Sequence, residues 1–321
     1  MATPANTAAS QPAKQPKQRR SGAFKRIMAN KYLYIMLAPV IAYFIIFEYK
    51  PMYGAIIAFK NFNPYQGIWD SPWAGLKHFY HFFDSYYFWR LLKNTLLISM
   101  LSLVIIFPAS IIFALLLNEV RSKYYKTFVQ TMSYLPHFVS LIVICGMVID
   151  FTSPNGIINR MIVSLGIASE PINFLILPEW FRSIYIGSGL WQSIGWNSII
   201  YLAALAGINP SLYEAAVVDG ASRWKQMLNV TIPGILPTIL ILLILNIGSL
   251  MSVGWDKIIL LYNSATYETA DVISTFVYRR GIMEADYSFS AAVGLFNSVI
   301  NFTLLILANR VSRKTTESSL W

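Results

Sequence analysis

The sequence predicts an all-α integral membrane protein with six transmembrane helices. Of its 321 residues 56% are hydrophobic and only 12% are charged, whereas soluble domains carry about a quarter charged residues. Long uncharged runs also recur along the chain, most of them at or above the roughly 20 residues that span a bilayer as a helix. These runs are residues 32–47, 94–118, 127–149, 183–213, 226–255 and 287–309.

The amino-terminal segment, residues 1–30, is rich in Ala, Pro, Gln, Lys and Arg and shows no apolar period. We therefore expect a disordered basic tail. The following run is short, but it ends in Phe-Glu-Tyr-Lys-Pro without the small residues of a cleavage site, which favours an uncleaved helix. Tyr32 and Tyr49 are suited to its two interfaces. Residues 31–310 then form one six-span domain, and residues 311–321 form a carboxy-terminal tail.

The distribution of basic residues predicts the orientation. With the amino terminus in the cytoplasm, the cytoplasmic segments hold 15 of the 25 Lys and Arg residues, in line with the positive-inside rule. Both termini are then cytoplasmic, as is the charged segment 214–237 between the fourth and fifth runs. The formal charge of +10 is explained by this placement without nucleic acid.

The segments between the other runs are then external. Residues 50–93 are polar and aromatic, and residues 72–92 place aromatic side chains at helical intervals. This pattern predicts either an amphipathic helix in the membrane interface or a plug of aromatic core against the helix bundle. Residues 151–182 and 256–286 are long enough to contact a partner protein or to cover a cavity.

The cytoplasmic segment 214–237 has the pattern of a small amphipathic helix. Gly220 permits a turn without the strain of a Cβ atom, while Trp224 and Met227 fall on one helical face. We expect Pro233 to end this helix because proline has no N–H donor. A solvated loop is the simpler alternative, but it leaves an exposed apolar face unexplained unless a partner covers it.

This segment resembles the EAA loop of binding-protein-dependent ABC importer permeases. Met227, Val230 and Ile232 stand where the family usually has Phe, Ile and Leu, which are changes that conserve size. The resemblance extends from Asn94 to Arg310 and is closest to permeases of oligosaccharide importers. The positions that match the family pattern as they stand are Glu214, Ala215, Ala216, Asp219, Gly220, Ala221 and Pro233.

The resemblance implies the type I permease fold of ABC importers, in which this segment docks in a cleft of an ATPase subunit. Glu214 would make polar contact and Gly220 would set the bend. The implied partners are a second homologous permease, two ABC ATPase subunits, an extracellular sugar-binding protein, an oligosaccharide and membrane lipid, without nucleic acid. The implied ATPase-coupling residues are Glu214, Ala215, Ala216, Asp219, Gly220, Ala221, Trp224, Met227 and Pro233.

The chain itself is not expected to bind a cofactor or to be an enzyme. No glycine is followed by lysine, so the Walker phosphate cradle is absent and ATP belongs to the partner subunits. No metal-ligand spacing occurs, and the single cysteine, Cys145, cannot form an intrachain disulfide. The runs hold only His137 as an ionisable group of the kind that couples ion transport, so the driving energy comes from elsewhere.

Neutral polar and aromatic residues within the runs are candidates for the substrate pathway. A sugar offers hydroxyls and weakly apolar C–H faces but no charge to pair. Any one Asn, Gln or Ser is explained more simply as a hydrogen-bonded contact between helices in lipid. In the resembling maltose-type permeases, the sugar contacts lie at certain separations along the chain from the EAA glutamate. The same separations in this chain lead to the neighbourhood of four candidates. These are Gln192, Trp196, Asn246 and Ser249.

Three alternatives stay open. One is a permease for another neutral or peptide-like solute. A second is an intramembrane hydrolase that uses His137 with a serine nucleophile, and a third is a scaffold for other membrane subunits. A neutral lining also argues against a strongly anionic substrate unless Arg or Lys comes from the partner permease.

Overall fold

The computed structural model describes Met28 and residues 30–316 and 319–320. The expected disordered tail therefore lies outside the described residues except at Met28 and Asn30. The chain divides into two compact units, residues 1–54 and 55–321. In both, the described regular structure is helical, with two isolated β-bridges and no strand. The all-α prediction is confirmed.

The first unit is helical from Lys31 onwards. Helix α2 (Lys31–Tyr43) leads through a π-helical turn, η1 (Phe44–Tyr49), into α3 (Lys50–Met52), and the 3-10 segment η2 (Tyr53–Phe59) crosses into the second unit. Pro51 lies two residues after the end of the π turn, in the first turn of α3. Because proline cannot donate to the carbonyl four residues earlier, a local change of helical register near it is expected.

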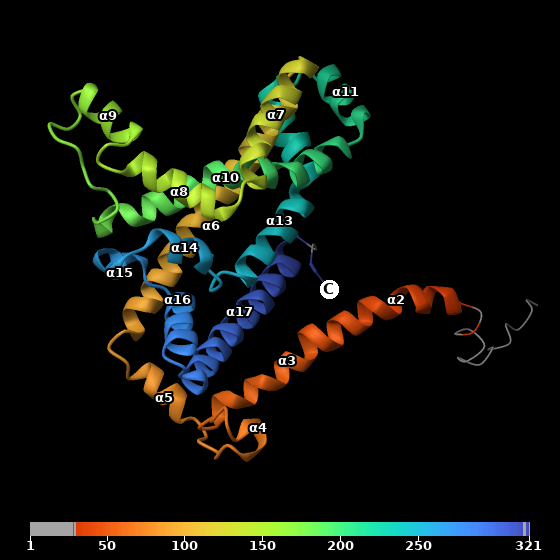
Figure 1. Cartoon of the computed structure of the whole chain (residues 1–321). Coiled ribbons are helices and arrows are strands. Elements are labelled where there is room, and N and C mark those ends of the chain that lie inside the picture. The colour runs from red at the N-terminus through yellow and green to blue at the C-terminus, as the bar shows by residue number, and fades with distance from the viewer. Residues whose placement is uncertain (1–27, 29, 317–318, 321) are drawn as a thin grey trace, which may run out of the picture. The chain divides into compact units, whose positions relative to one another are not determined.

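The second unit holds the remaining helices, which Figure 1 labels in chain order. The longest are α6 (Phe88–Glu119), α10 (Pro178–Ala206) and α17 (Tyr287–Thr316). The others are α4 (Gly67–Asp70), α5 (Lys77–Phe83), α7 (Lys123–Phe138), α8 (Leu141–Thr152), α9 (Ile157–Ser164), α11 (Pro210–Val218), α12 (Arg223–Gln226), η3 (Met227–Thr231), α13 (Ile232–Gly248), α14 (Trp255–Leu261), η4 (Ser264–Thr266), α15 (Tyr267–Ala270), α16 (Ile273–Tyr278) and η5 (Arg279–Met283).

Five stretches of the described chain are helical, long and apolar enough to cross a membrane: Lys31–Phe59, Phe88–Glu119, Leu141–Ser164, Arg223–Gly248 and Tyr287–Lys314. Helix α10 is long enough but does not reach the same hydropathy, because Ser, Gly, Gln and Asn interrupt its apolar residues. The predicted count of six spans therefore stays a prediction.

The third predicted run, residues 127–149, is not one helix. Helix α7 ends at Phe138, Val139 is extended, and α8 begins at Leu141. Pro136 removes an N–H donor from the last turn of α7, and the hydroxyl of Ser140 accepts a hydrogen bond from the Val143 N–H at 3.4 Å. The chain thus gains a new N-cap where a continuous helix was expected.

The fourth predicted run, residues 183–213, is also divided. Helix α10 begins earlier, at Pro178, and ends at Ala206. Asn209 then caps α11 by accepting a hydrogen bond from the Ser211 N–H at 3.0 Å. Pro210 occupies the first turn of α11, where a missing N–H has no cost.

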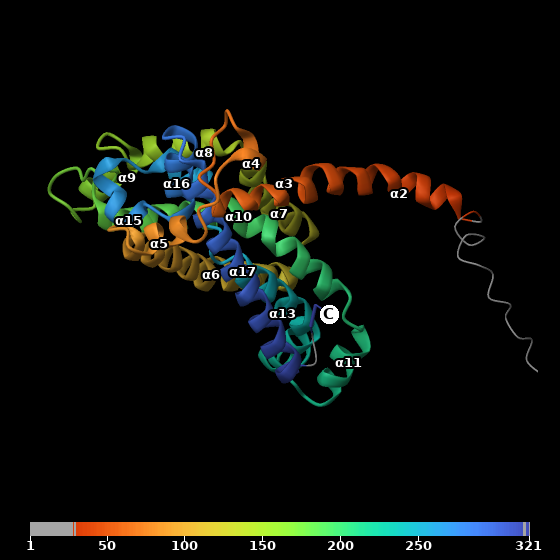
Figure 2. The ribbon, with the colours of Figure 1, turned by 90° about the horizontal axis from the view of Figure 1, so that it is seen from below.

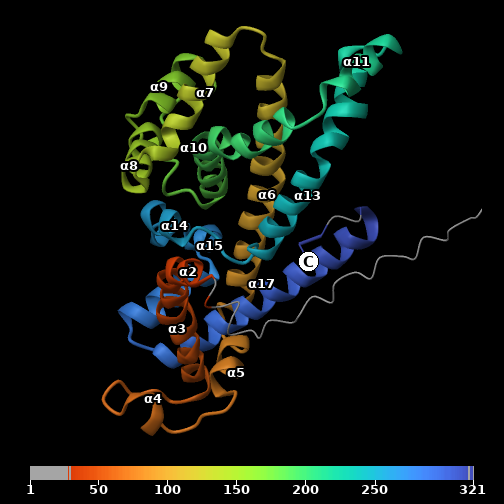
Figure 3. The same cartoon turned by 90° about the vertical axis from the view of Figure 1, so that its right-hand side faces the viewer.

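Three buried clusters lie along α6 and join it to the rest of the second unit. Helix α10 crosses α6 and also packs on α7, while α13 runs beside α17 (Figures 2 and 3). The cluster near the start of α6 contains Phe82, Phe88 and Leu91 packed with Phe276 and Phe289. Phe82, Phe88 and Leu91 thus pack into the bundle, whereas Trp73, Leu76 and Tyr80 of the same segment are exposed, so both alternatives for residues 72–92 stay predictions.

A buried amide fastens α6 to the segment before α16. The side-chain nitrogen of Asn94 donates to the carbonyl oxygens of Glu268 and Asp271, at 2.9 and 3.0 Å. Its oxygen accepts a hydrogen bond from Arg182 of α10 at 2.8 Å. One side chain thereby fixes three segments that are far apart in the sequence.

Helix α10 also approaches α7 very closely at Gly195. A Cβ atom there would lie closer than 3.0 Å to the backbone carbonyl of Ser133. The absence of a side chain lets the two backbones touch, as small residues do where membrane helices pack.

Candidate functional site

The EAA-like loop, residues 210–233, begins with the regular helix α11, which ends in a glycine cap. At the end of α11 the Gly220 N–H bonds the Val217 carbonyl at 3.0 Å, and the Ala221 N–H bonds the Ala216 carbonyl at 2.8 Å. Gly220 has φ +70°. This hydrogen-bond pair with a left-handed glycine is the Schellman arrangement. The expectation of a turn at Gly220 is confirmed.

The expectation that Pro233 ends a helix is wrong. Helix α12, the π-helical segment η3 and α13 follow one another without a break from Arg223 to Gly248. Pro233 stands in the first turn of α13, two residues after the π-helical segment 227–231. The π-helical segment changes the helical register before the proline, so the helix continues where we expected it to end.

Both short helices of the loop expose apolar side chains. Val217 is 61% exposed, Val218 86% and Trp224 67%. Glu214 and Asp219 are also exposed, whereas Met227 is only partly exposed. Exposed apolar side chains beside an exposed carboxylate are typical of a surface that contacts a partner.

One ion pair joins the loop to the helix bundle, and one hydrogen bond joins two parts of the loop. Arg223 forms a 2.8 Å ion pair with Glu119 at the end of α6. The Tyr213 hydroxyl lies 3.0 Å from the Thr231 hydroxyl and joins α11 to η3. The loop therefore contacts α6 directly through Arg223, and η3 continues into α13.

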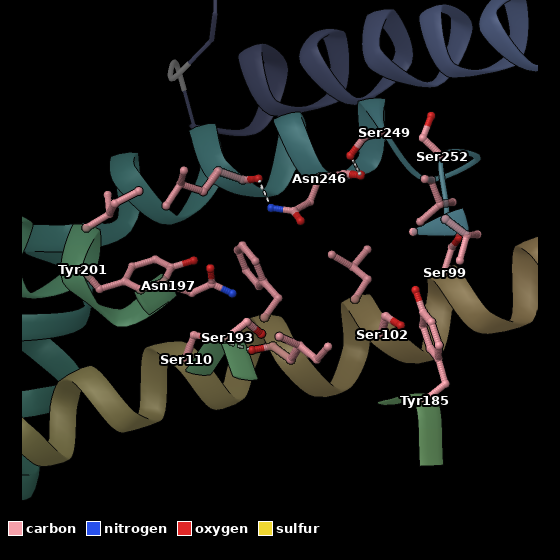
Figure 4. Close-up of a pocket in the computed structure, with 18 residues that line it drawn as sticks. Ser99, Ser102, Ser110, Tyr185, Ser193, Asn197, Tyr201, Asn246, Ser249 and Ser252 are labelled. Atoms are coloured by element: carbon pink, nitrogen blue, oxygen red, sulfur yellow. Dashed lines mark hydrogen bonds between the residues drawn. The ribbon is translucent and has the colours of Figure 1, made fainter. Parts of the chain in front are cut away.

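A cavity of about 360 Å³ opens between α6, α10 and α13 (Figure 4). Helix α6 contributes Ser99, Ser102 and Ser110, and α10 contributes Ser193 and Asn197 on the same helical face. None of the 18 lining residues carries a formal charge: they are Ser99, Ser102, Leu103, Ile106, Phe107, Ser110, Tyr185, Ser193, Asn197, Ile200, Tyr201, Leu242, Asn246, Ser249, Leu250, Ser252, Val253 and Gly254.

The polar groups of this cavity keep hydrogen-bonding capacity for a ligand. Asn246 donates from its nitrogen to the Leu242 carbonyl at 2.8 Å, which leaves its oxygen available as an acceptor. The hydroxyls of Ser110 and Ser193 donate to carbonyls of their own helices and keep free lone pairs. Such a wall suits a neutral, hydroxyl-rich ligand.

Two of the four substrate-pathway candidates lie in this cavity. Asn246 and Ser249 line it from α13 and the turn after it, as Figure 4 shows. Gln192 and Trp196 are not among its lining residues. The Trp196 ring is stacked on that of His137, with centroids 4.3 Å apart and planes within 5°. The substrate role of these residues stays a prediction.

Sequence reasoning did not select Ser193, Asn197 and the serines of α6 for the cavity. Ser193 and Asn197 follow Gln192 and Trp196 by one residue, which is a rotation of about 100° around the helix. The spacing of the polar residues was visible in the sequence. The rotation of α10, which turns one face toward α6 and α13, depends on packing and could not be read from the sequence.

A buried lysine lies behind the cavity wall. Lys257 of α14 is 7% exposed, and its ammonium group donates to the Tyr185 carbonyl at 3.3 Å. Among the described residues it has no carboxylate in ion-pair range. Burial lowers the pKa of Lys257 to about 8. Among the described residues no group of three or more His, Cys, Asp and Glu side chains is placed to hold a metal ion.

The sequence matches the family model described as "Binding-protein-dependent transport system inner membrane component" over residues 106–317. Two Bacillus subtilis (strain 168) relatives are similar over nearly the whole chain. The "Polygalacturonan/rhamnogalacturonan transport system permease protein YteP" is 43% identical, covering 95% of both chains. "Protein LplB" is 44% identical, covering 91% of this chain and 92% of its own.

Two solved structures are similar in fold and sequence. One is a chain of a bacterial ABC transporter "involved in the import of the acidic polysaccharide alginate", with a TM-score of 0.84 and 47% identity, covering 91% of this chain and 99% of that chain. The other is a chain of the bacterial alginate ABC transporter "in complex with alginate pentasaccharide-bound periplasmic protein", with a TM-score of 0.86, 45% identity and coverage of 93% and 99%.

Proposed function

We propose that this chain, which belongs to the family of binding-protein-dependent transport system inner membrane components, forms half of the translocation pathway of an ATP-driven oligosaccharide importer. The chain is a permease subunit of an ABC importer, with the fold of that class, and is not an enzyme. It is a multi-pass protein of a bacterial membrane. The hydrolase alternative is set aside because the family model and the named relative describe a transport permease.

The substrate class is inferred from the cavity together with the relatives. The cavity offers amides, hydroxyls and tyrosine rings without charge. One relative above 40% identity is named for polygalacturonan and rhamnogalacturonan transport, and one similar structure for the import of alginate. An oligosaccharide fits these names and the cavity. For an acidic saccharide, the second permease would supply the cations that this cavity lacks. Asn246 and Ser249 are proposed as substrate-facing, with Gln192 and Trp196 as further positions on the pathway.

The EAA-like loop is proposed as the site where an ATPase subunit docks. The observation that carries this role is the exposed surface of Val217, Val218 and Trp224 beside Glu214, fixed to α6 through Arg223 and Glu119. In the proposed assembly two ATPase subunits, a second permease and an extracellular binding protein complete the importer. Closure of the ATPases would move the loop and, through it, α6 and α13. The proposal puts both termini and the loop on the cytoplasmic side, as the distribution of Lys and Arg predicts.

The proposal is tested by uptake into proteoliposomes that contain the purified complex, with ATP inside and the binding protein outside. We expect uptake of labelled oligogalacturonate that requires ATP and the binding protein. Uptake of peptides in place of saccharides would support the alternative permease. No uptake of any solute, with an unaffected ATPase, would favour the scaffold.

A further inference from the structure

Three arginine side chains gather around one carboxylate where α6 and α10 begin. The Asp271 carboxylate is completely buried, and it pairs with Arg279 of η5 at 2.7 Å and with Arg90 of α6 at 3.4 Å. Arg182 of α10 donates to the side-chain oxygen of Asn94, which lies about one helical turn after Arg90 on α6. We call Arg90, Arg182, Arg279 and Asp271 the arginine cluster.

The arginine cluster carries more positive than negative charge. Three guanidinium groups share one carboxylate, which leaves an excess of two positive charges. Glu179 and Glu268, each three residues from a member of the cluster, are exposed and form no ion pair with any described residue. Like charges that are partly withdrawn from water repel one another more strongly than in solution. A bound anion would relieve this repulsion.

Two of the three arginines keep accessible N–H donors. Nη1 of Arg90 and Nη1 of Arg182 make no hydrogen bond with the described residues and remain accessible, whereas Nε of both residues is buried. The Arg90 side chain is 30% exposed, and its Cζ lies 4.9 Å from the centre of the Tyr87 ring. Stacking on a ring leaves the donors of a guanidinium group free in its plane, where they can bind a carboxylate.

Arg182 lies on the side of α10 that faces the cavity between α6, α10 and α13. It precedes the lining residue Ser193 by 11 residues, which is about three full turns. Tyr185, one turn after Arg182, lines the cavity as well. In the predicted orientation the arginine cluster is therefore at the external end of α10, and the neutral lining residues follow deeper along the same side.

We propose that the arginine cluster is a carboxylate site, at which Arg90 and Arg182 bind a uronate group of an acidic oligosaccharide before the saccharide enters the cavity. The inference rests on the proposed function as an oligosaccharide permease and narrows its substrate to saccharides that carry carboxylates. Both guanidinium groups are mostly buried, which favours the narrow chain of a saccharide over the surface of a folded protein.

The test compares uptake of pentagalacturonate with uptake of its methyl ester, which has the same rings without the charges. Arg90→Gln and Arg182→Gln each remove one cation and keep an amide donor. We expect each to lower pentagalacturonate uptake by the reconstituted complex about fivefold, the effect of one partly exposed ion pair. Uptake of the ester should change less than about twofold, and Arg90→Lys, which keeps the charge, should retain most pentagalacturonate uptake.

Two further measurements separate this role from a structural one. The melting temperature of Arg90→Gln should stay close to that of wild type, because Asp271 keeps its closer partner Arg279. The ATPase activity that the binding protein stimulates without saccharide should also be unchanged in both Gln variants, since this activity reports docking of the binding protein.

Arg280→Gln is the matched control. It removes the same charge from the residue next to Arg279, but Arg280 pairs with Glu284 and does not belong to the cluster. This variant should take up pentagalacturonate normally. A loss equal to that of Arg90→Gln would assign the effect to net charge and overturn the inference.

The remaining outcomes also decide the question. Normal pentagalacturonate uptake by both Gln variants, or equal loss of acid and ester, overturns the inference while the proposed function stands. Loss of the ATPase stimulation would mean that the arginines bind a carboxylate of the binding protein instead. Wild-type complex that takes up only the ester would exclude an acidic substrate alone, and wild type that takes up neither would overturn the proposed substrate class as well.

Discussion

Asp271 and Arg279 form a two-point ion pair inside the segment that follows α14. The Arg279 guanidinium donates to both carboxylate oxygens, at 2.9 Å to Oδ1 and 2.7 Å to Oδ2. The Asp271 side chain is completely buried, and the Thr275 hydroxyl also donates to it at 2.8 Å. Since the Asp271 carbonyl holds Asn94 of α6, this pair supports the packing of the whole region.

Replacing Asp271 by Asn should therefore be costly. It leaves the Arg279 cation without its carboxylate in a partly buried place, and breaking a buried pair from one side typically costs about 3–5 kcal/mol. We expect a markedly lower melting temperature of the purified protein in detergent. Glu284→Gln, which breaks the more exposed Arg280–Glu284 pair, should cost less than about 1 kcal/mol. Equal effects of the two substitutions would contradict this account.

The buried lysine predicts a dependence of stability on pH. Burial lowers the pKa of Lys257 from 10.5 to about 8, so between these values the unfolded chain binds a proton that the folded chain does not. Stability should then rise as the pH increases from 8 toward 10.5. Melting temperatures at pH 7.5 and 9.5 measure this rise, which should shrink in Lys257→Met. An unchanged slope in that variant would assign the effect to other groups.

The amide of Asn246 is expected to contact substrate. Asn246→Leu keeps the size of the side chain but removes the free acceptor from the cavity, so saccharide uptake should fall about fivefold at unchanged protein level. The same uptake assay separates the candidates on α10. If Gln192 contacts substrate on the pathway, saccharide uptake by Gln192→Leu should fall by a similar factor. If Gln192 has no such contact, as its position outside the cavity lining indicates, uptake should change less than about twofold.

The cap of α11 gives a prediction about coupling. Gly220→Asp forces a side chain into a left-handed backbone, φ +70°, at a cost of about 1–2 kcal/mol, and adds a charge to the proposed docking surface. Membrane insertion should stay normal while ATP-driven uptake is lost. Gly166→Asp is the matched control, because Gly166 has φ +69° and equally open space but lies outside the loop. Loss of uptake in both would indicate backbone strain instead of lost docking.

The sequence predicted the class of the protein better than the course of its helices. The left-handed Gly220 and the exposed Trp224 followed from local residue properties, which do not depend on the rest of the fold. Local residue properties did not predict the break at Val139 or the continuation of the helix through Pro233. At these places capping by Ser140 and a π-helical turn compete closely with a regular helix. The cavity lining required the rotation of α10, which is set where Gly195 meets α7.

The central claim is that the EAA-like loop couples this permease to an ATPase, and co-purification tests it most directly. The tagged chain would be isolated from gently solubilised native membrane, as wild type and as Glu214→Lys. We expect an ATPase, a second permease and an external binding protein with the wild type, and selective loss of the ATPase with Glu214→Lys. Equal recovery of the ATPase with both chains, or wild type recovered without any partner, would contradict the claim.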